Sequence, residues 1–352
     1  MKIAKFLALA GILGDAAVNV NGRTLVATNG FASMIATLDD AISELPRYLS
    51  QAVANAVMLM GDDVKLSFAN DRVTVSNQSG RVRFPYAPCE IALRNGTVAQ
   101  CTFSLDLDGL KGLARVSALS IPSVLTNAYV QGVSLWSIKG AVFAAASSGQ
   151  VLHKTRVAEC ESDCSYVLPA KIAKALPKIF HDGCVACIGP EGAMFSDDQV
   201  EIRCALLNSG NNEMVRNMVA SRCADPAFSL ANSADLVQAL DAVALTGNKV
   251  YLRSSKPGFI EVAAEMDPES MVSVSANTTG TLEVLLIASQ LSNALGTLLG
   301  PIECGQTRVG KNEPIMIAES GTANGFLIGR VLPTNSGQGV GEQSTQEVAH
   351  HA

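Results

Sequence analysis

Four cysteines in the middle of the chain have a spacing that is typical of a metal site. Cys160 and Cys164 are separated by three residues, and Cys184 and Cys187 by two. Two such pairs fall within the spacing of zinc ribbons, in which four thiolates hold one zinc ion. However, residues 184–188 alternate as a strand does, and positions three apart on a strand point to opposite faces. A zinc-binding structural protein therefore stays an alternative interpretation.

Two histidines near these cysteines suggest a second chemistry, in which a cysteine nucleophile is activated by a histidine. His153 precedes the first cysteine pair and His181 precedes the second. A single histidine in a strand or at a helix end is far more often structural. The sequence also contains no phosphate-binding glycine loop, paired-carboxylate motif or serine elbow. We therefore expect a protein that is not an enzyme, with no catalytic residues, no metal and no cofactor.

Composition limits the class of protein. The chain has 352 residues, of which 48% are hydrophobic and 16% charged, so it can form two or three globular domains. Its net charge of −6 argues against a uniformly basic DNA-binding domain, but permits basic groups on one inner surface. Nine cysteines at irregular spacing predict a reducing compartment such as the cytoplasm.

The first eleven residues allow an alternative interpretation as a secretory signal. Lys2 and Lys5 are followed by an apolar stretch, and Asp15 interrupts that pattern soon afterwards. No segment reaches the roughly 18 uncharged apolar residues of a membrane span. We therefore expect no membrane association.

An internal repeat organises the elements that must position these side chains. Three hairpin segments end on Gly30, Gly149 and Gly258. Three strand-to-helix steps follow them, with Pro46 and Pro169 expected at a first helical position. Three strand pairs come next, by alternation and turn chemistry. The hairpins, helix steps and strand pairs are, in that order, residues 20–30, 138–149 and 247–258; residues 45–53, 168–176 and 286–295; and residues 64–75, 184–195 and 302–317.

The repeat predicts an α+β protein of three tandem domains, each an antiparallel sheet with helices on one face. We expect domain 1 at residues 1–92, domain 2 at residues 93–221 and domain 3 at residues 222–333. The last segment, residues 334–352, is rich in Gly, Ser, Gln and Glu and is expected to be a flexible tail.

The order of these units and three local segments resemble the bacterial DNA polymerase III beta sliding clamp family. Residues 143–157, 166–171 and 326–333 are similar to family segments, and the resemblance runs from residue 11 to residue 333. It implies DNA-clamp domains in a head-to-tail homodimer, a ring of six domains whose helices line the hole. It also implies a processivity factor that encircles double-stranded DNA without sequence preference. The family begins with a strand and a helix, so the first domain here is expected to lack an edge strand.

The resemblance places DNA contacts on the inner helices. Lys171, Lys174 and Lys178 share one helix face, which suits sequence-independent phosphate contacts, although an ordinary solvated face is the alternative. The implied DNA-binding residues are Arg47, Lys111, Arg115, Tyr129, Lys171, Lys174 and Lys178. The third unit departs from the family, because its presumed inner helices, residues 233–245 and 287–299, contain no Lys or Arg. This keeps open a clamp-fold adaptor that gathers proteins without encircling DNA.

The resemblance also implies a pocket that receives short linear peptides of DNA polymerase and of the clamp loader. Its matching positions are Val130, Ser147, Gly149, Gln150, Val151, Leu152, Leu327, Gly329, Arg330 and Val331. This chain has Gln150 and Val151 where the family has His-Arg, and Gly329 and Arg330 where it has Met-Pro. Partner motifs are therefore expected to differ.

A third implied surface is the dimer interface. Its matching positions are Arg81, Arg83 and Phe84 on one side, and Ala244, Leu245, Glu261 and Glu265 on the other. We expect Arg83 to face Glu261 and Phe84 to face Leu245, which would combine charge attraction with an apolar centre.

Overall fold

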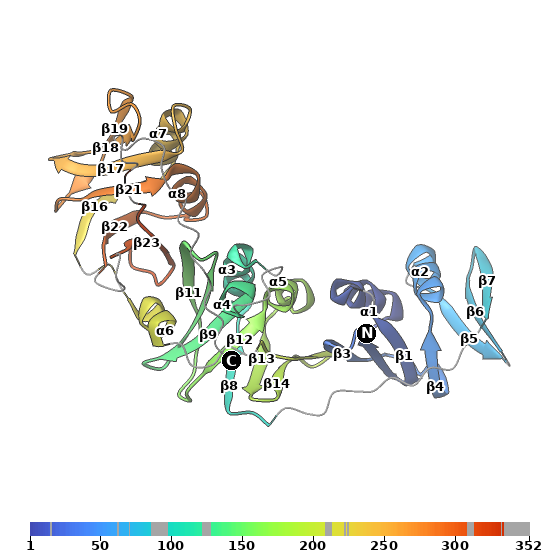
Figure 1. The fold of residues 1–352 in the computed structure, drawn as a ribbon. Coiled ribbons are helices and arrows are strands. Elements are labelled where there is room, and N and C mark those ends of the chain that lie inside the picture. The colour runs from blue at the N-terminus through green and yellow to red at the C-terminus, as the bar shows by residue number, and fades with distance from the viewer. Residues whose placement is uncertain are drawn as a thin grey trace, which may run out of the picture.

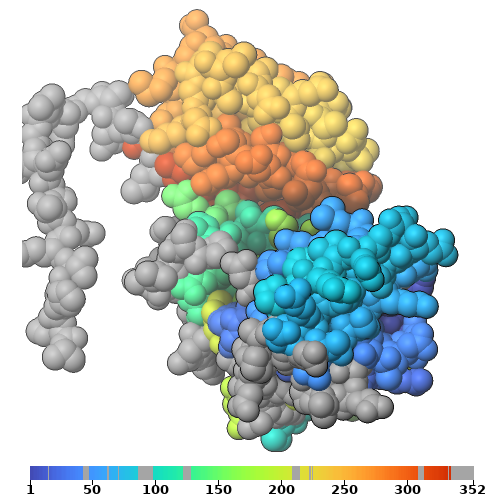
Figure 2. Space-filling model, turned by 90° about the vertical axis from the view of Figure 1, so that its right-hand side faces the viewer, coloured from blue at the N-terminus to red at the C-terminus, as the bar shows by residue number. Residues whose placement is uncertain are grey.

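The computed structural model describes residues 1–14, 16–61, 63–69, 71–85, 98–121, 128–207, 213–221, 223, 225–307, 313–331 and 333. Their helices and strands form three similar units that follow one another along an open arc (Figure 1). Figure 2 looks at the molecule from the side of unit 1, which lies at the front in blue, with unit 3 above it in yellow and orange. The direction of the arc therefore changes at unit 2. The predicted domain boundaries near residues 92 and 222 and the predicted tail lie outside the described residues.

The first two units share one order of elements. Unit 1 contains α1 (Ile3–Ala10), η1 (Gly11–Leu13), β1 (Ala17–Gly22), β2 (Thr24–Thr28), β3 (Ala32–Thr37), β4 (Ser43–Leu49), α2 (Gln51–Met60), β5 (Lys65–Ala69), β6 (Arg72–Asn77) and β7 (Gly80–Pro85). Unit 2 contains β8 (Cys101–Leu105), α3 (Leu107–Val116), η2 (Ser117–Leu119), α4 (Ala128–Gln131), β9 (Gly132–Ile138), β10 (Ala141–Ser147), β11 (Val151–Glu159), β12 (Ser165–Pro169), α5 (Ala170–Ile179), β13 (Cys184–Gly189), β14 (Gly192–Ser196) and β15 (Val200–Cys204).

The third unit repeats that order after a connecting helix, α6 (Glu213–Ala220). It contains β16 (Pro226–Leu230), α7 (Ala234–Ala244), β17 (Lys249–Lys256), β18 (Phe259–Ala264), β19 (Met271–Ser275), β20 (Asn277–Thr278), β21 (Glu283–Ile287), α8 (Ala288–Leu295), β22 (Ile302–Gln306), β23 (Ile315–Glu319) and β24 (Gly325–Ile328). The predicted α+β arrangement, with antiparallel sheets and helices on one side, is confirmed.

Neighbouring units are joined by backbone hydrogen bonds across shared sheets. Strand β3 of unit 1 pairs with β15 of unit 2, which creates one sheet in the order β4-β1-β2-β3-β15-β14-β13-β8. Strand β11 of unit 2 likewise pairs with β24 of unit 3, in the order β12-β9-β10-β11-β24-β23-β22-β16-β20. Two smaller sheets lie at the two ends of the arc: β5-β6-β7 in unit 1 and β19-β18-β17-β21 in unit 3.

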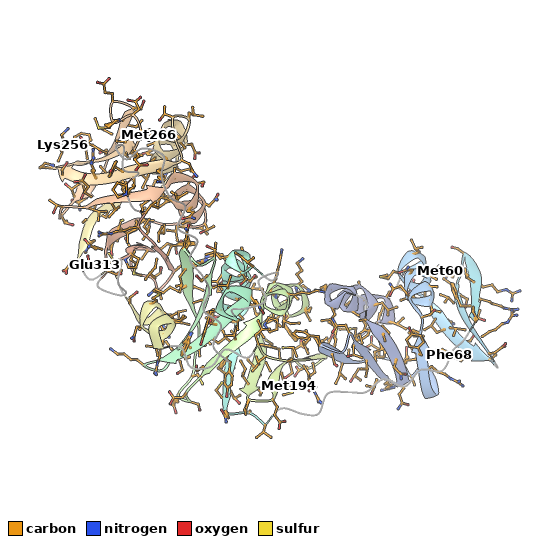
Figure 3. The ribbon with its side chains drawn as sticks, in the orientation of Figure 1. Met60, Phe68, Met194, Lys256, Met266 and Glu313 are labelled. Carbon is orange, nitrogen blue, oxygen red and sulfur yellow. The ribbon has the colours of Figure 1, made fainter. Side chains whose placement is uncertain are left out.

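The helices cover one side of these sheets because each has a single buried stripe. Helix α3 buries Leu110, Leu113 and Val116, and α7 buries Leu236 and Leu240. In Figure 1 the paired helices of all three units, α1 with α2, α3 with α5 and α7 with α8, lie on the concave side of the arc. The sheets lie on the convex side, where Met194 of β14 is labelled in Figure 3.

The first unit differs from the others in its end sheet and contains the apolar segment at the start of the sequence. Its end sheet has three described strands, β5, β6 and β7, whereas the corresponding parts of units 2 and 3 contain β8 and β16 as a further strand. That the first domain lacks an edge strand stays a prediction. The apolar segment read alternatively as a secretory signal forms α1. Phe6 is fully buried in the core that units 1 and 2 share, so this segment is part of the folded domain.

Two details of the predicted repeat were wrong. Pro46 lies in strand β4, and the helix begins only at Gln51 after the Ser50 cap, because the backbone here continues the pairing with β1. If β1, β9 and β17 are counted as the first strands of their units, the matched glycines also differ in position. Gly30 and Gly149 follow the second strands, β2 and β10, but Gly258 follows the first, β17.

The glycines that do correspond are Gly22, Gly140 and Gly258, in the turn after the first strand of each unit. They are 118 residues apart at each step (140 − 22 and 258 − 140), and all have positive φ, at 59°, 78° and 83°. A side chain is disfavoured in that backbone conformation, which gives a physical reason for glycine there.

The junction between units 2 and 3 contains buried polar side chains. Lys154 of β11 is 3% exposed, and its Nζ donates to the carbonyl oxygens of Val219 (2.8 Å) and Ser221. Its neighbour His153 is 1% exposed, lies 2.9 Å from Asn324 Oδ1 and stacks on Phe326 at 4.1 Å between ring centroids. Burial lowers the pKa of His153 to about 4, since an imidazolium there would lose its hydration, and the Arg115 charge acts in the same direction.

This low pKa predicts a pH-dependent stability. An unfolded chain binds a proton at His153 near the ordinary pKa of 6.5, whereas the folded protein binds it only near pH 4. Stability should therefore fall as pH decreases from about 6.5 to 4, by on the order of 3 kcal/mol from this group. Urea unfolding at several pH values should show a weaker acid dependence for His153→Gln than for the wild type. The exposed His181→Gln is the control; equal slopes for all three proteins would contradict the assignment.

Candidate nucleic-acid interface and partner surfaces

The predicted basic residues of unit 2 lie together on the concave side. Lys111 and Arg115 extend from α3, and Lys171, Lys174 and Lys178 from α5, a helix that packs beside α3. The four lysines are exposed and Arg115 is half-buried. Their spacing on each helix places them opposite the buried stripe, so the helix packing that forms the core also presents these charges.

Lys171 also has a structural role. Its Nζ donates to the carbonyl oxygen of Leu13 at 2.7 Å, so α5 of unit 2 is tied to η1 of unit 1. A carbonyl at the end of a helix is an acceptor that needs a partner, and a lysine supplies one with added charge. Lys174 and Lys178 continue the same exposed face further along α5.

Two predicted DNA contacts are in places that do not fit the prediction. Arg47 was expected on an inner helix but lies in strand β4, with its guanidinium 5.8 Å from the centre of the Phe68 ring. Tyr129 is 8% exposed and belongs to an apolar cluster with Trp136 and Leu152. Its ring is thus used in packing, because α4 folds back onto the sheet.

Sequence reasoning missed charged residues on two other concave helices. Helix α1 exposes Lys5, and Lys2 is exposed at its N-cap, where its Nζ lies 3.5 Å from Asp63 Oδ1. Helix α7 exposes Asp235 and Asp241. The signal for Lys5 was the lysine spacing before an apolar stretch, which had been considered as part of a secretory signal. The signal for the aspartates was their spacing on the helix.

The predicted peptide-binding residues meet where units 2 and 3 join. Leu152 of β11 pairs with Leu327 of β24, and the amide of Gly329 donates to the carbonyl of Gln150 at 2.9 Å. Leu152 and Leu327 are buried in the cluster that contains Tyr129, whereas Val151 faces the core of unit 3. Around them the structure places half-buried Val130, Ser147, Gly329, Arg330 and Val331, and exposed Gly149 and Gln150.

A cavity in the described residues lies apart from these positions. It has a volume of about 2120 Å³ and lies on the other side of this junction. Its walls come from α3, the far half of β11 and the β23–β24 turn, with side chains of both charges such as Arg115, Arg156 and Glu319. It contains none of the predicted peptide-binding residues.

The predicted dimer surfaces are at the two ends of the arc. Arg81, Arg83 and half-buried Phe84 lie in β7, which pairs on one side with β6. At the other end Leu245 is 88% exposed, just after α7, and Ala244 is half-buried. Figure 3 shows Phe68 of the β5-β6-β7 sheet and Lys256 of the unit 3 sheet at these opposite ends.

The two predicted interface acids are not at an edge of the sheet. Glu261 lies in β18, is 7% exposed and has Lys256 Nζ at 2.6 Å from its Oε1. Glu265 has Lys249 Nζ at 3.6 Å. The edge strand of this sheet is β19, which pairs with β18, so β18 is an inner strand. The expected Arg83–Glu261 pair stays a prediction, and the exposed acids near that edge are Asp267 and Glu269.

The cysteines do not form the alternative zinc site. Ile188 pairs with Cys101 across β13 and β8, and Cys187 pairs with Thr102, so Cys187 lies on the opposite face of the sheet from Cys101. Cys164 is hydrogen-bonded to Cys101, and this contact and burial both raise the pKa of the Cys164 thiol. Burial likewise raises the pKa of Cys184 to about 12. Within the described part of the chain, no three His, Cys, Asp or Glu side chains are arranged to hold a metal ion.

The remaining alternatives also find no support in the described residues. Buried, protonated thiols are poor nucleophiles, and His153 is hydrogen-bonded to Asn324 rather than to a cysteine. Among the described helices, none has both the length and the apolar character needed to cross a membrane.

Comparison with known proteins gives the fold and not the sequence family. No protein-family model and no curated protein matches this sequence. Among solved structures, a DNA polymerase sliding clamp from Pseudomonas aeruginosa is similar with a TM-score of 0.76 and 15% identity, over 94% of this chain and 97% of the other. The DNA polymerase III beta subunit of Thermotoga maritima has a TM-score of 0.76 and 16% identity, with 94% and 97% covered.

A third similar structure is a Helicobacter pylori beta clamp bound to a DNA ligase peptide. Its TM-score is 0.74 at 10% identity, and the match covers 94% of this chain and 98% of the other. The three-unit chain described above therefore has the sliding clamp fold over nearly its whole length, as the resemblance implied.

Proposed function

We propose that this chain is a DNA sliding clamp: a non-enzymatic processivity factor of DNA replication that encircles double-stranded DNA in the cytoplasm. The observation that carries the proposal is the concave row of helices, whose middle unit has exposed Lys111, Lys174 and Lys178 and half-buried Arg115. Cations on mobile side chains attract phosphates without reading bases, and such contacts allow sliding. As part of this proposal, we place the domain boundaries near residues 92 and 222, where the sequence predicts them.

The internal junctions support closure of the ring by a second copy. In each junction the third strand counted from β1 or β9 pairs with the last strand of the next unit: β3 with β15, and β11 with β24. Counted from β17, the third strand of unit 3 is β19. The same rule applied to the ends pairs β19 of one chain with β7 of another, and two copies would then give six units. An edge strand offers unpaired N–H and C=O groups, so this contact is physically available.

Apolar side chains at the two ends fit that pairing. Inside the chain η1, which ends in Leu13, packs on α5 of the next unit, and Leu119 of η2 packs against the core of unit 3. Leu245, just after α7, is the corresponding residue at the end of the arc. It is 88% exposed, as is Leu59 on α2 at the other end. Contact between these leucines in a dimer would bury both.

The end-to-end contact predicts that Leu245→Asp weakens dimerisation. Because a charge would replace an apolar contact at the interface centre, the dissociation constant should rise by about 30-fold or more. Analytical ultracentrifugation over a range of concentrations measures it. Leu299→Asp is the matched control, since Leu299 is 83% exposed on the same unit but follows α8. An equally stable Leu245→Asp dimer would refute this interface.

Encirclement is tested by the topology of the DNA. Protein loaded on nicked circular DNA should stay bound during gel filtration and be lost when a restriction enzyme cuts the circle. Lys174→Glu with Lys178→Glu should shorten retention at low salt, whereas Lys65→Glu with Lys139→Glu, exposed lysines on a strand and a turn, should not. If cutting the circle does not release the protein, the ring proposal fails. If the chain dimerises and binds peptides but is never retained, the adaptor is the better proposal.

We also propose that partners such as DNA polymerase and the clamp loader bind by short linear peptides beside Val130 and Gln150. The support is the junction of β11 and β24, where an apolar cluster lies beneath a rim of small and aliphatic residues. The ligase peptide on the Helicobacter pylori clamp shows that one protein of this fold binds a peptide.

Fluorescence anisotropy with a labelled peptide of that DNA ligase tests the peptide site. The wild type should bind it, and Val130→Asp should bind at least about tenfold more weakly, because a carboxylate would be buried by the peptide's apolar side chains. Val185→Asp, on a 41% exposed valine of β13, is the control. Equal binding by Val130→Asp and wild type would count against the site.

A further inference from the structure

The three units present different charges on the concave side. Helices α3 and α5 of unit 2 carry four exposed lysines and the half-buried Arg115. The exposed carboxylate on these two helices is Asp108. In unit 1, Lys5 is exposed on helix α1 and Lys2 is exposed at its N-cap, and α2 exposes uncharged side chains such as Gln51 and Asn55. Unit 3 is the reverse. Helix α7 exposes Asp235 and Asp241, and α7 and α8 contain no Lys or Arg.

The two aspartates are on the side of α7 that faces away from its sheet. Leu236, Ala239, Leu240 and Val243 are buried against the sheet, and Asp235, Gln238 and Asp241 are exposed on the opposite stripe. Both carboxylates are held there. Asp235 is in the first turn of the helix, where a negative charge is favoured, and Asp241 accepts a hydrogen bond from Ser292 of α8 at 3.0 Å.

We infer that the duplex is held against units 1 and 2 of each chain and kept away from unit 3 by Asp235 and Asp241. This inference rests on the proposed encirclement of DNA. Phosphates and these carboxylates repel one another at separations below the Debye length of roughly 8 Å at physiological salt. Cations on α3 and α5 attract the same phosphates. A ring of two chains then has two sectors that attract the DNA and two that repel it. Such a ring binds DNA more weakly than a uniformly basic ring would.

The arrangement has a physical consequence for sliding. Each phosphate contact adds to affinity and to its salt dependence, with a slope of about 0.9 for each phosphate neutralised. Fewer contacts lower the barrier to moving from one phosphate to the next. Asp235 and Asp241 therefore set the strength of the hold, while the dimer contact keeps the ring closed.

The first test changes the charge of unit 3. Asp235→Lys with Asp241→Lys places four new cations in the ring, so retention on nicked circular DNA should last longer, and the plot of log affinity against log salt should become steeper by roughly 2 to 4. Glu191→Lys with Asp198→Lys is the matched control, since both residues are exposed in turns beside β14 on the convex side. An unchanged slope in the concave variant, or an equal change in the control, would overturn the inference.

The second test maps contact directly. A photoactivatable crosslinker is attached to a cysteine introduced as Lys174→Cys on α5 or as Gln238→Cys on α7, between the two aspartates. The α5 probe should crosslink to the circular DNA several-fold more than the α7 probe, and Asp235→Lys with Asp241→Lys should raise the α7 yield. Equal yields from both positions in the parent protein would contradict the inference.

The two tests separate this inference from the proposed function. If the wild type is not retained on circular DNA, encirclement fails and so does everything built on it. If it is retained and released by cutting, but both probes crosslink equally, the clamp stands and the two-sector hold is wrong.

Discussion

The backbone hydrogen bonds that join the edge strands of neighbouring units are the constraint on which the rest of the structure depends. Pairing of β3 with β15 and of β11 with β24 turns three small domains into one continuous, curved layer. Because the units meet at their edges and their helices stay on one side, that side becomes a concave surface. Among the described strands, the same constraint leaves β7 and β19 as edges at the two ends of the arc, and the proposed second copy would pair there.

The junction of units 2 and 3 combines this pairing with side chains that are specific to it. Val151 of β11 packs into unit 3, while Leu152 beside it packs into the cluster with Tyr129. Strand geometry gives this alternation, so one strand contributes to two cores. Buried Lys154 donates a hydrogen bond to the carbonyl oxygen of Val219 in the connecting helix α6, and buried His153 is hydrogen-bonded to Asn324 in the β23–β24 turn of unit 3. The proposed peptide site depends on the same junction, and its rim exists only because both units contribute to it.

Charge is distributed by element rather than by overall composition. A net charge of −6 coexists with a middle unit whose concave helices are basic. The proposed function uses those cations, and the two-sector hold uses the carboxylates of α7. Both ideas depend on the same arrangement: the helices lie on the concave side of the arc, so side chains on the face of a helix opposite its buried stripe are turned toward the space that the arc encloses.

The sequence by itself determined the three-unit repeat, the hairpins around the later strands and the lysine face of α5, because these follow from local periodicity and turn chemistry. It could not place Arg47, Tyr129 or Glu261, since a strand, a helix fold-back and a covering edge strand decide their exposure. Nor could it predict the hydrogen bond between Cys101 and Cys164 or the one from Lys171 to the carbonyl oxygen of Leu13, because these residues are distant in the chain. Those depend on how sheets stack and units meet, which only the tertiary structure decides.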